Sequence, residues 1–432
     1  KTLDKFLEFK NQNFRLIVIN DNSTDYTRNI VNSFLNKDER IILFDKFNYN
    51  GKSGKGSVLN FAIDQLINLF KHKFLEPLNL DNTFLEKYSY DKIIIGVYDA
   101  DSIPDLNSIN KISLFFEKTE CDACQTLVRI SNRNKNLLAK MQDIEFIGFS
   151  RVIQKGRSII GSVGLGGNGQ FVKLSSLLKL GEKPWGDTLT EDLELGLRLI
   201  AKGLKLGYCD DIITEQEGVI KLKSLIIQRS RWLQGHLMNW KYIPKIISSK
   251  SKLITKIDTI FYLTFVTTVP LITVSWFLSI LSFMKIIFIK NLILNYFWNL
   301  NNLLGFIIII LFSLTFLPIF FYGIRDFYKD NKYKKLFDII IFAIYTYIWI
   351  PSFFIAIFRI ILKRRQWIKT ERYVFEKPYL ESINILTYER RLHPRISLNM
   401  FKVIEDFPAF LLDYSEGGIG ILTYLENAKK DI

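Results

Sequence analysis

The sequence is poor in the residues that build disulfides and most transition-metal sites. It contains 3 Cys and 3 His among 432 residues. Three cysteines do not form a disulfide framework, and their scarcity suits a reducing, cytoplasmic setting. Cys121 and Cys124 have redox or metal spacing, but they open a predicted strand without a second pair or a nearby His, which favours simple packing. His72, His236 and His393 are scattered, so we interpret them as structural.

The sequence also lacks a P-loop and any nucleic-acid-binding module. The loop around Lys52 and Lys55 is rich in Gly, Lys and Ser, but it does not complete the G-x-x-x-x-G-K pattern before a helix. Lys and Arg number 58 against 43 acidic residues, a formal net charge of +15. Because the basic residues are scattered and several flank apolar stretches, the excess indicates a membrane surface, and we expect no nucleic-acid partner.

Apolar residues are abundant: they make up 48% of the chain, which includes 36 Phe. Residues 257–289, 303–324 and 336–362 are each long and apolar enough to span a bilayer. The basic clusters at 325–335 and 363–365 both predict a cytoplasmic position, yet one crossing cannot connect two cytoplasmic flanks. Either one stretch is re-entrant or interfacial, or one of the two basic clusters does not mark a cytoplasmic segment, so the number of crossings stays open.

The first part of the chain alternates between predicted helices and buried strands. We expect helices over 1–13, 24–36 and 58–72, and strands over 14–19, 41–44 and 93–98. This order predicts a parallel, doubly wound sheet with ligands at the carboxyl ends of its strands, where Asp21 and Asp99 fall. A glycine-rich segment at 158–171, a helix through 191–202 and an amphipathic, interfacial helix at 221–248 follow.

Carboxylates follow the second long buried strand and begin a later helix. Asp99 and Asp101 can hold Mg²⁺ or Mn²⁺ against a diphosphate, although a lone Asp-x-Asp is more often a solvated turn. Asp192, beside Glu191, is the candidate general base that deprotonates an acceptor hydroxyl. Thr190-Glu191-Asp192 is also good helix-capping sequence, and the two interpretations are compatible.

Arg231 and Trp232 form the last polar motif before the apolar region. With Gln228 they offer a guanidinium for phosphate and an indole for a sugar face. The alternative is an ordinary interfacial helix, in which Arg and Trp are enriched anyway.

The ordered set of motifs resembles that of family 2 glycosyltransferases, and more narrowly the processive, membrane-embedded branch that includes cellulose, hyaluronan and β-glucan synthases. The resemblance covers roughly residues 14–372. Its motifs are Asn20-Asp21-Asn22-Ser23-Thr24-Asp25, Asp99-Ala100-Asp101, Gly166-Gly167-Asn168-Gly169-Gln170-Phe171, Thr190-Glu191-Asp192 and Gln228-Arg229-Ser230-Arg231-Trp232. It implies a GT-A-like α/β domain that performs an inverting transfer with a divalent cation and no covalent enzyme intermediate.

The resemblance also implies a role for each motif residue. Asp21, Lys55, Asp99 and Arg231 would bind the nucleotide sugar, and Asp99 with Asp101 the metal. Asp192, with Glu191 beside it, would be catalytic. The growing acceptor would contact Trp232, Gln228, Gly167 and Asn168.

The tail resembles a PilZ domain, which binds cyclic di-GMP. The family pattern is Arg-x-x-x-Arg followed by Asp/Asn-x-Ser-x-x-Gly. Its counterparts here, which would bind the ligand through guanidinium pairs and base-edge contacts, are Arg391, Arg395, Asp413, Ser415 and Gly418.

The sequence departs from these families at both ends. The first strand of the glycosyltransferase domain, with its Pro-x-Tyr-Asn-Glu-like end, is missing, and Asn20 stands where the family usually has an acid. The PilZ part is too short to close a β-barrel. We therefore expect the natural chain to extend beyond both ends of this sequence.

Together these features predict three domains and one principal function. The domains are a glycosyltransferase domain at 1–250, a transmembrane region at 251–372 and a partial PilZ domain at 373–432. We expect a multi-pass enzyme of the bacterial inner membrane, with cytoplasmic catalytic and PilZ parts, that polymerises a UDP-sugar, first UDP-glucose, into a β-linked exopolysaccharide under cyclic di-GMP control. Its partners would be the polysaccharide acceptor, membrane lipid and accessory export subunits. The alternatives are a non-processive lipid glycosyltransferase and a non-catalytic cyclic di-GMP receptor of an export complex.

Overall fold

The computed structural model of the chain describes residues 2–10, 13–23, 25–46, 54–283, 316–328, 332–364 and 419–424. Within these residues the strands form one sheet in the order β2-β1-β7-β3-β5-β4-β6. The strands are β1 (Phe14–Asn20), β2 (Ile41–Asp45), β3 (Ile93–Tyr98), β4 (Ala123–Ile130), β5 (Gln170–Lys173), β6 (Leu206–Gln216) and β7 (Ile419–Tyr424).

The sheet is mixed, so the prediction of a parallel, doubly wound sheet is wrong. β1 pairs with β2, and β4 with β6, in parallel, but β5 runs antiparallel to both β3 and β4. The glycine-rich segment before β5 helps the chain to reverse its direction. Gly167 and Gly169 have φ angles of 75° and 66° there, which residues with a side chain disfavour. The α/β character of the domain is confirmed.

Apolar side chains cover both faces of the sheet. Alternation along β1 sends Ile17 and Ile19 into one core with α3 (Lys55–Lys71), and Leu16 and Val18 into the other with α5 (Ser108–Lys118). The other helices of this part are α1 (Thr2–Leu7), α2 (Thr27–Leu35), α4 (Phe84–Lys87), α8 (Leu174–Leu178) and α9 (Glu191–Ala201). Because both faces are packed, polar chemistry is left to the strand ends.

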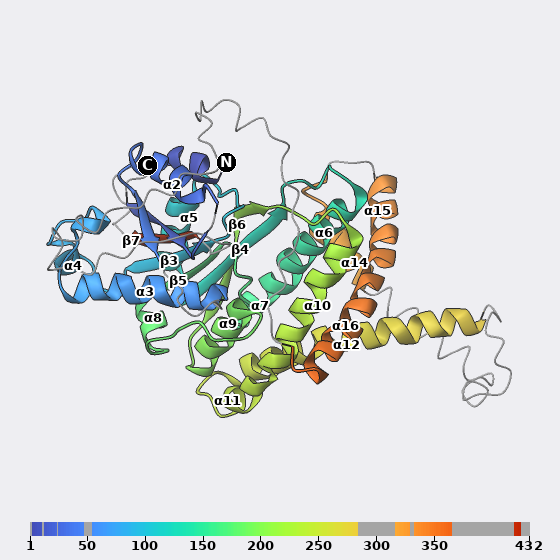
Figure 1. The fold of residues 1–432 in the computed structure, drawn as a ribbon. Helices are drawn as coiled ribbons and strands as arrows, with labels where there is room; N and C mark the ends of the chain where they lie inside the picture. The colour runs from blue at the N-terminus through green and yellow to red at the C-terminus, as the bar shows by residue number, and fades with distance from the viewer. Residues whose placement is uncertain are drawn as a thin grey trace.

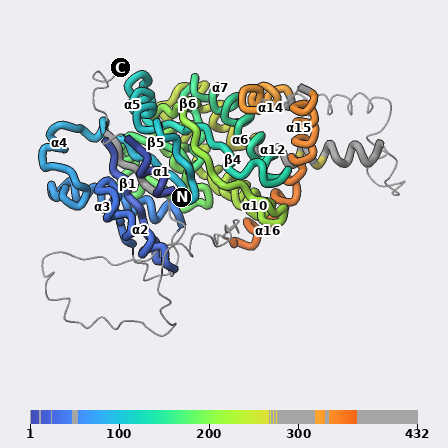
Figure 2. The backbone as a smooth tube through the Cα atoms, turned by 90° about the horizontal axis from the view of Figure 1, so that it is seen from above, coloured from blue at the N-terminus to red at the C-terminus, as the bar shows by residue number. Residues whose placement is uncertain are grey.

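A group of helices lies beside one end of the sheet (Figures 1 and 2). These are α6 (Leu137–Gly148), α7 (Lys155–Ile160), α10 (Leu222–Met238), α11 (Ile243–Ile247), α12 (Leu253–Phe283), α14 (Phe316–Ile324), α15 (Lys332–Tyr345) and α16 (Trp349–Ile361). Among the described residues, one helical stretch, Tyr333–Ile361, is long and apolar enough to cross a membrane. It matches the third predicted apolar stretch. Of the second stretch only residues from 316 onward are described.

Most of the predicted PilZ segment lies outside the described residues. This holds for all of its proposed ligand-binding residues: Arg391, Arg395, Asp413, Ser415 and Gly418. The described part, Ile419–Tyr424, is strand β7, which pairs antiparallel with β1 and β3. The partial PilZ domain therefore stays a prediction.

Candidate active site

Lys55 and Asp99 form the centre of a polar cluster at the edge of the sheet. Asp99 follows β3, and Lys55 is the first residue of α3. The Lys55 ammonium donates to an Asp99 carboxylate oxygen and to the Gly167 carbonyl, the latter at 3.0 Å. The structure thus joins three sequence motifs that are 44 to 112 residues apart.

The start of α9 supplies two further carboxylates, Glu191 and Asp192. A Cβ on Gly56 would lie 2.7 Å from the Gly186 carbonyl and 3.2 Å from the Glu191 Cβ, so glycine lets α3 and α9 begin side by side. A Cβ on Gly167 would lie 2.9 Å from an Asp192 oxygen. These approaches place both carboxylates beside the Lys55–Asp99 pair, while their predicted catalytic roles stay predictions.

The charges in this cluster shift one another's titration. Burial, together with the charge of Asp192, raises the pKa of Glu191 to about 7, against the opposing charge of Lys55. Burial also raises the pKa of Asp192, although a 2.7 Å hydrogen bond from the Leu193 N–H acts in the other direction. Burial would lower the pKa of Lys55, but Asp99 and Glu191 outweigh it and raise that pKa. At neutral pH Lys55 is therefore cationic, and the two α9 carboxyls share a raised affinity for protons.

Asn168 is buried, with a relative exposure of 1%, and its side chain is engaged inside the protein. Its Oδ1 accepts from the Asp99 N–H at 3.3 Å and from the Ser102 hydroxyl at 2.8 Å, while its Nδ2 donates to Gln216 at 2.9 Å. Asn168 therefore holds the Asp99-Ala100-Asp101 turn. The predicted acceptor role remains a prediction, and the positioning role was missed because a motif does not show where its amide points.

Asp21 lies at the end of β1, where it forms an ion pair with Lys46 at 3.1 Å. Asn20 is fully buried and donates to Asp45 at 3.0 Å. The predicted position of Asp21 at a strand end is confirmed, while its nucleotide role is untested. Sequence reasoning missed Lys46, although its place one residue after the neighbouring strand was a usable signal.

Helix α10 brings Arg231 of the Gln228–Trp232 motif close to the same site. A Cβ on Gly235 would overlap the Thr190 side chain, so this glycine allows α10 to pack directly against the start of α9. The positive charge of Arg231 reaches Glu191, whose pKa it lowers, less strongly than burial and Asp192 raise it. Arg231 is thus close enough to act on the same charged group as Lys55.

Arg229 is the buried arginine of the motif. Its guanidinium pairs with Glu145 at 2.5 Å and stacks on Trp232, with 3.9 Å from Cζ to the ring centroid. Gln228 accepts from Arg229 at 3.2 Å. Arg229 was absent from the predicted site, and its contacts indicate that it orients the Trp232 indole that sequence analysis assigned to the acceptor.

Whether a divalent cation fits this site depends on the ligands that the described residues can supply. Among them no group of three or more His, Cys, Asp or Glu side chains could hold a metal ion. Asp99 and Asp101 offer carboxylate oxygens at one turn, which suit Mg²⁺ or Mn²⁺ when phosphates and water complete the coordination. The residues therefore fit a cation that arrives with a diphosphate, and do not form an all-protein cage.

The sequence matches two family descriptions. "Glycosyl transferase family group 2" covers residues 94–358, and "Glycosyl transferase family 2" covers residues 1–66. Together they contain Asp21, Lys55 and all motif residues from Asp99 to Trp232.

Three proteins illustrate the range of its relatives. A "probable glycosyltransferase YdaM" of Bacillus subtilis is 28% identical over 381 residues, which are 85% of this chain and 81% of that protein. A β-monoglucosyldiacylglycerol synthase of Synechocystis is 32% identical over 156 residues, 35% of this chain and 32% of that protein. A poly-β-1,6-N-acetyl-D-glucosamine synthase of Staphylococcus aureus is 26% identical over 242 residues, 54% of this chain and 50% of that protein.

Proposed function

The chain belongs to glycosyl transferase family group 2 and is a hexosyltransferase, and from this premise we propose that it transfers a sugar from a UDP-sugar to a growing β-linked exopolysaccharide at the inner membrane. The observation that carries the proposal is the meeting of Lys55, Asp99 and the Glu191–Asp192 pair at one edge of the sheet. Cations for a diphosphate and a carboxylate for an acceptor proton are what this reaction needs.

In the proposed reaction Asp192 accepts the proton of the acceptor hydroxyl as its oxygen bonds to the anomeric carbon. The bond from that carbon to the diphosphate oxygen breaks, and the diphosphate leaves with the electron pair. Lys55 and Arg231 then oppose the negative charge that develops on the leaving group. A divalent cation held by Asp99 and Asp101 would supply further charge neutralisation when bound.

The raised pKa of Asp192 suits a general base. A carboxylate with an ordinary pKa of 3.8 is a weak proton acceptor at neutral pH, and a raised value brings it closer to the operating pH. The Asp99 carboxylate contributes to this shift, because its negative charge disfavours ionisation of the nearby Asp192.

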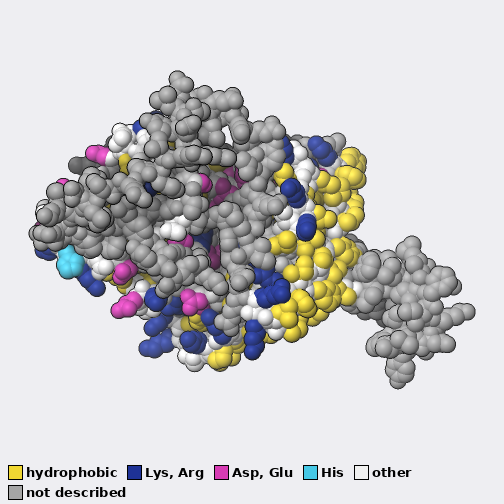
Figure 3. Space-filling view, in the orientation of Figure 1, with side chains coloured by type: hydrophobic (Ala, Val, Ile, Leu, Met, Phe, Trp, Pro, Cys, Tyr) yellow, Lys and Arg dark blue, Asp and Glu magenta, His cyan; other side chains and the backbone are white. Residues whose placement is uncertain are grey.

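Membrane embedding is supported by the exposed apolar side chains of the helix group. They gather on the side of the molecule at the right of Figure 3, next to Lys and Arg side chains. The large ones on α15 and α16 are Tyr333, Leu336, Phe337, Ile340, Ile344, Phe354, Ile355, Phe358, Ile360 and Ile361. A continuous apolar surface bordered by basic groups is typical of a protein that contacts a bilayer.

A second candidate is non-processive glycosylation of a lipid. The similarity to the β-monoglucosyldiacylglycerol synthase of Synechocystis favours it over the receptor alternative, which would not need the Lys55–Asp99–Asp192 cluster. Incubation of the full-length protein in membranes with labelled UDP-glucose and UDP-N-acetylglucosamine, followed by gel and lipid-phase analysis, separates the two. A high-molecular-weight product supports polymerisation, whereas label found only in extractable lipid contradicts it.

Control by cyclic di-GMP is proposed on the Arg391 to Gly418 motifs alone. The expected result is direct binding of cyclic di-GMP to the wild type and a higher turnover, both lost in Arg391→Ala. Absence of binding to the wild type, or activation that survives in Arg391→Ala, would remove the regulatory part of the proposal and leave the transfer reaction untouched.

A further inference from the structure

A basic pocket of about 590 Å³ lies where α6 and the loop after β4 meet the segment following α14. Its cationic lining comprises Arg129, Arg133, Lys140 and Lys334, and Phe327 and Tyr328 add two aromatic rings. None of the nine lining residues is acidic, and none belongs to the sugar-transfer site. We propose that this basic pocket binds the headgroup of an anionic membrane lipid.

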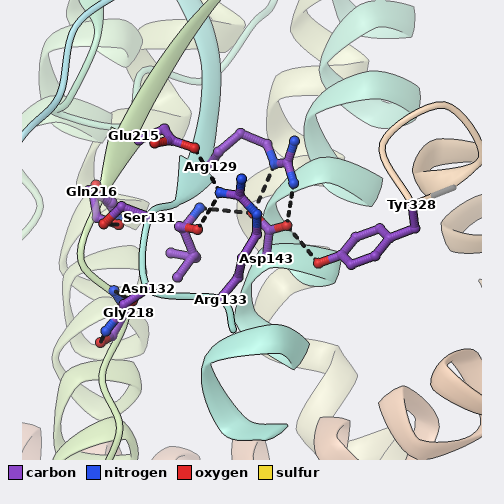
Figure 4. A network of polar contacts seen from close by, with 10 residues as sticks. Arg129, Ser131, Asn132, Arg133, Asp143, Glu215, Gln216, Gly218 and Tyr328 are labelled. Carbon is purple, nitrogen blue, oxygen red and sulfur yellow. Dashed lines mark hydrogen bonds and ion pairs between the residues drawn. The ribbon is translucent and has the colours of Figure 1, made fainter. Parts of the chain in front are cut away.

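Figure 4 shows the carboxylates that hold the two arginines, Asp143 for Arg129 and Glu215 for Arg133. Arg129 donates from Nε and Nη2 to Asp143 at 2.9 and 2.7 Å, and the Asp143 side chain is fully buried. Tyr328 donates to the same carboxylate at 2.7 Å. Arg129 is therefore fixed through two of its nitrogens, so that Nη1 is not committed to Asp143. A guanidinium held in this way is preorganised for an anion.

Arg133 is also held by a carboxylate, that of Glu215, which is more exposed than Asp143. Its Nη1 donates to Glu215 at 2.7 Å and to the Ile130 carbonyl at 2.9 Å, and both side chains of the ion pair are 29% exposed. The first turn of α6 adds to the positive field, because Asn136 and Leu137 also line the pocket. Four basic side chains and a helix N-terminus thus meet at one pocket, and three of these side chains also pair with carboxylates outside its lining. This combination of fixed donors suits a phosphate group.

The position of the pocket favours a lipid over a soluble phosphate. Lys334 lies in the first turn of α15, at the start of the stretch Tyr333–Ile361 that is long and apolar enough to cross a membrane. Tyr333 and Phe337 expose 79% and 60% of their surface beside it. A phosphate in the pocket could therefore carry acyl chains along α15, and basic groups at such a boundary attract anionic headgroups.

Lys140 connects the pocket to the same helix. It pairs with Asp338 of α15 at 2.5 Å, and its ammonium lies 5.4 Å from the Tyr328 ring centroid. The pocket walls from α6 and α15 are thus joined, and the cavity does not depend on a single loop. A volume of about 590 Å³ falls within the range of roughly 300–1,000 Å³ typical of small-molecule sites.

The test measures retained lipid on the full chain reconstituted in mixed phosphatidylglycerol and phosphatidylcholine nanodiscs and analysed by native mass spectrometry. Arg133→Gln/Lys334→Gln is compared with Lys71→Gln/Lys118→Gln, which removes the same charge at exposed positions on α3 and α5. We expect wild type and control to retain phosphatidylglycerol, and the pocket variant to retain roughly tenfold less. Lys334→Gln alone, at an exposed position, is expected to give a smaller loss in the same direction and guards against misfolding of the double variant.

Two results would overturn the inference. One is equal phosphatidylglycerol retention in the pocket and control variants. The other is displacement of the lipid from the wild type by inorganic phosphate or glycerol phosphate at equal concentration, because the pocket would then take soluble phosphates without help from acyl chains.

Discussion

Replacing Glu191 by Gln removes one of the two carboxylates at the start of α9. Burial and the charge of Asp192 raise the pKa of Glu191 from 4.5 to about 7. A difference of that size corresponds to at most roughly 3 kcal/mol of folding free energy. Because the pKa is higher in the folded state, this contribution is complete below about pH 4.5 and is lost as the pH rises through 7. Gln does not ionise, so the Glu191→Gln variant does not lose this folding free energy as the pH rises.

The free energy of unfolding of Glu191→Gln, relative to wild type, is therefore expected to rise by up to about 3 kcal/mol between about pH 4.5 and pH 8. Burial and the charge of Asp99 are what raise the pKa of Asp192, so the acid limb of the pH–rate profile should stay in place in this variant. Denaturant unfolding in detergent and initial rates across pH measure the two effects. A stability difference that is the same at both pH values, or an acid limb that moves, would refute the electrostatic reasoning.

Two further predictions concern α10, whose position sets that of Arg231. The new methyl group of Gly235→Ala should overlap Thr190 and lower the free energy of unfolding by roughly 1–3 kcal/mol. Gly156→Ala is the control, because open space surrounds its Cβ, and it should leave stability unchanged or raise it. Thermal unfolding compares the two variants, and equal effects would disprove the contact. Arg229→Ala should lower the free energy of unfolding by roughly 3 kcal/mol, because it removes the buried cation that neutralises Glu145 and leaves that carboxylate with the Tyr345 hydroxyl. A loss below about 1 kcal/mol in the same assay would show that the ion pair contributes little to stability.

The sequence alone located the strand ends that carry the chemistry. β3 was predicted residue for residue because a continuous apolar run between polar segments has few alternative structures, and Asp99 followed from it. The direction of β5 was missed, since the glycine-rich segment before it signals a sharp turn without giving the partner strand.

Contacts between distant side chains were beyond sequence reasoning. Lys55 was identified near the nucleotide, yet its ion pair with Asp99 depends on how α3 is placed against β3. Asn168 was assigned to the acceptor from its motif, whereas the structure shows its amide engaged with the Asp99 turn and Gln216. Local patterns fix elements and their ends, while such pairings depend on tertiary packing.

The most direct test of the central claim is sugar transfer by Asp192→Asn in native membranes, with labelled UDP-sugars and the full-length protein. Asp211→Asn is the matched control, because Asp211 is an exposed carboxylate on β6. We predict that Asp192→Asn loses at least roughly a hundredfold in rate while Asp211→Asn transfers at the wild-type rate. Transfer by Asp192→Asn at a rate comparable to wild type would contradict the assignment of Asp192 as the base and, with it, the account of this site.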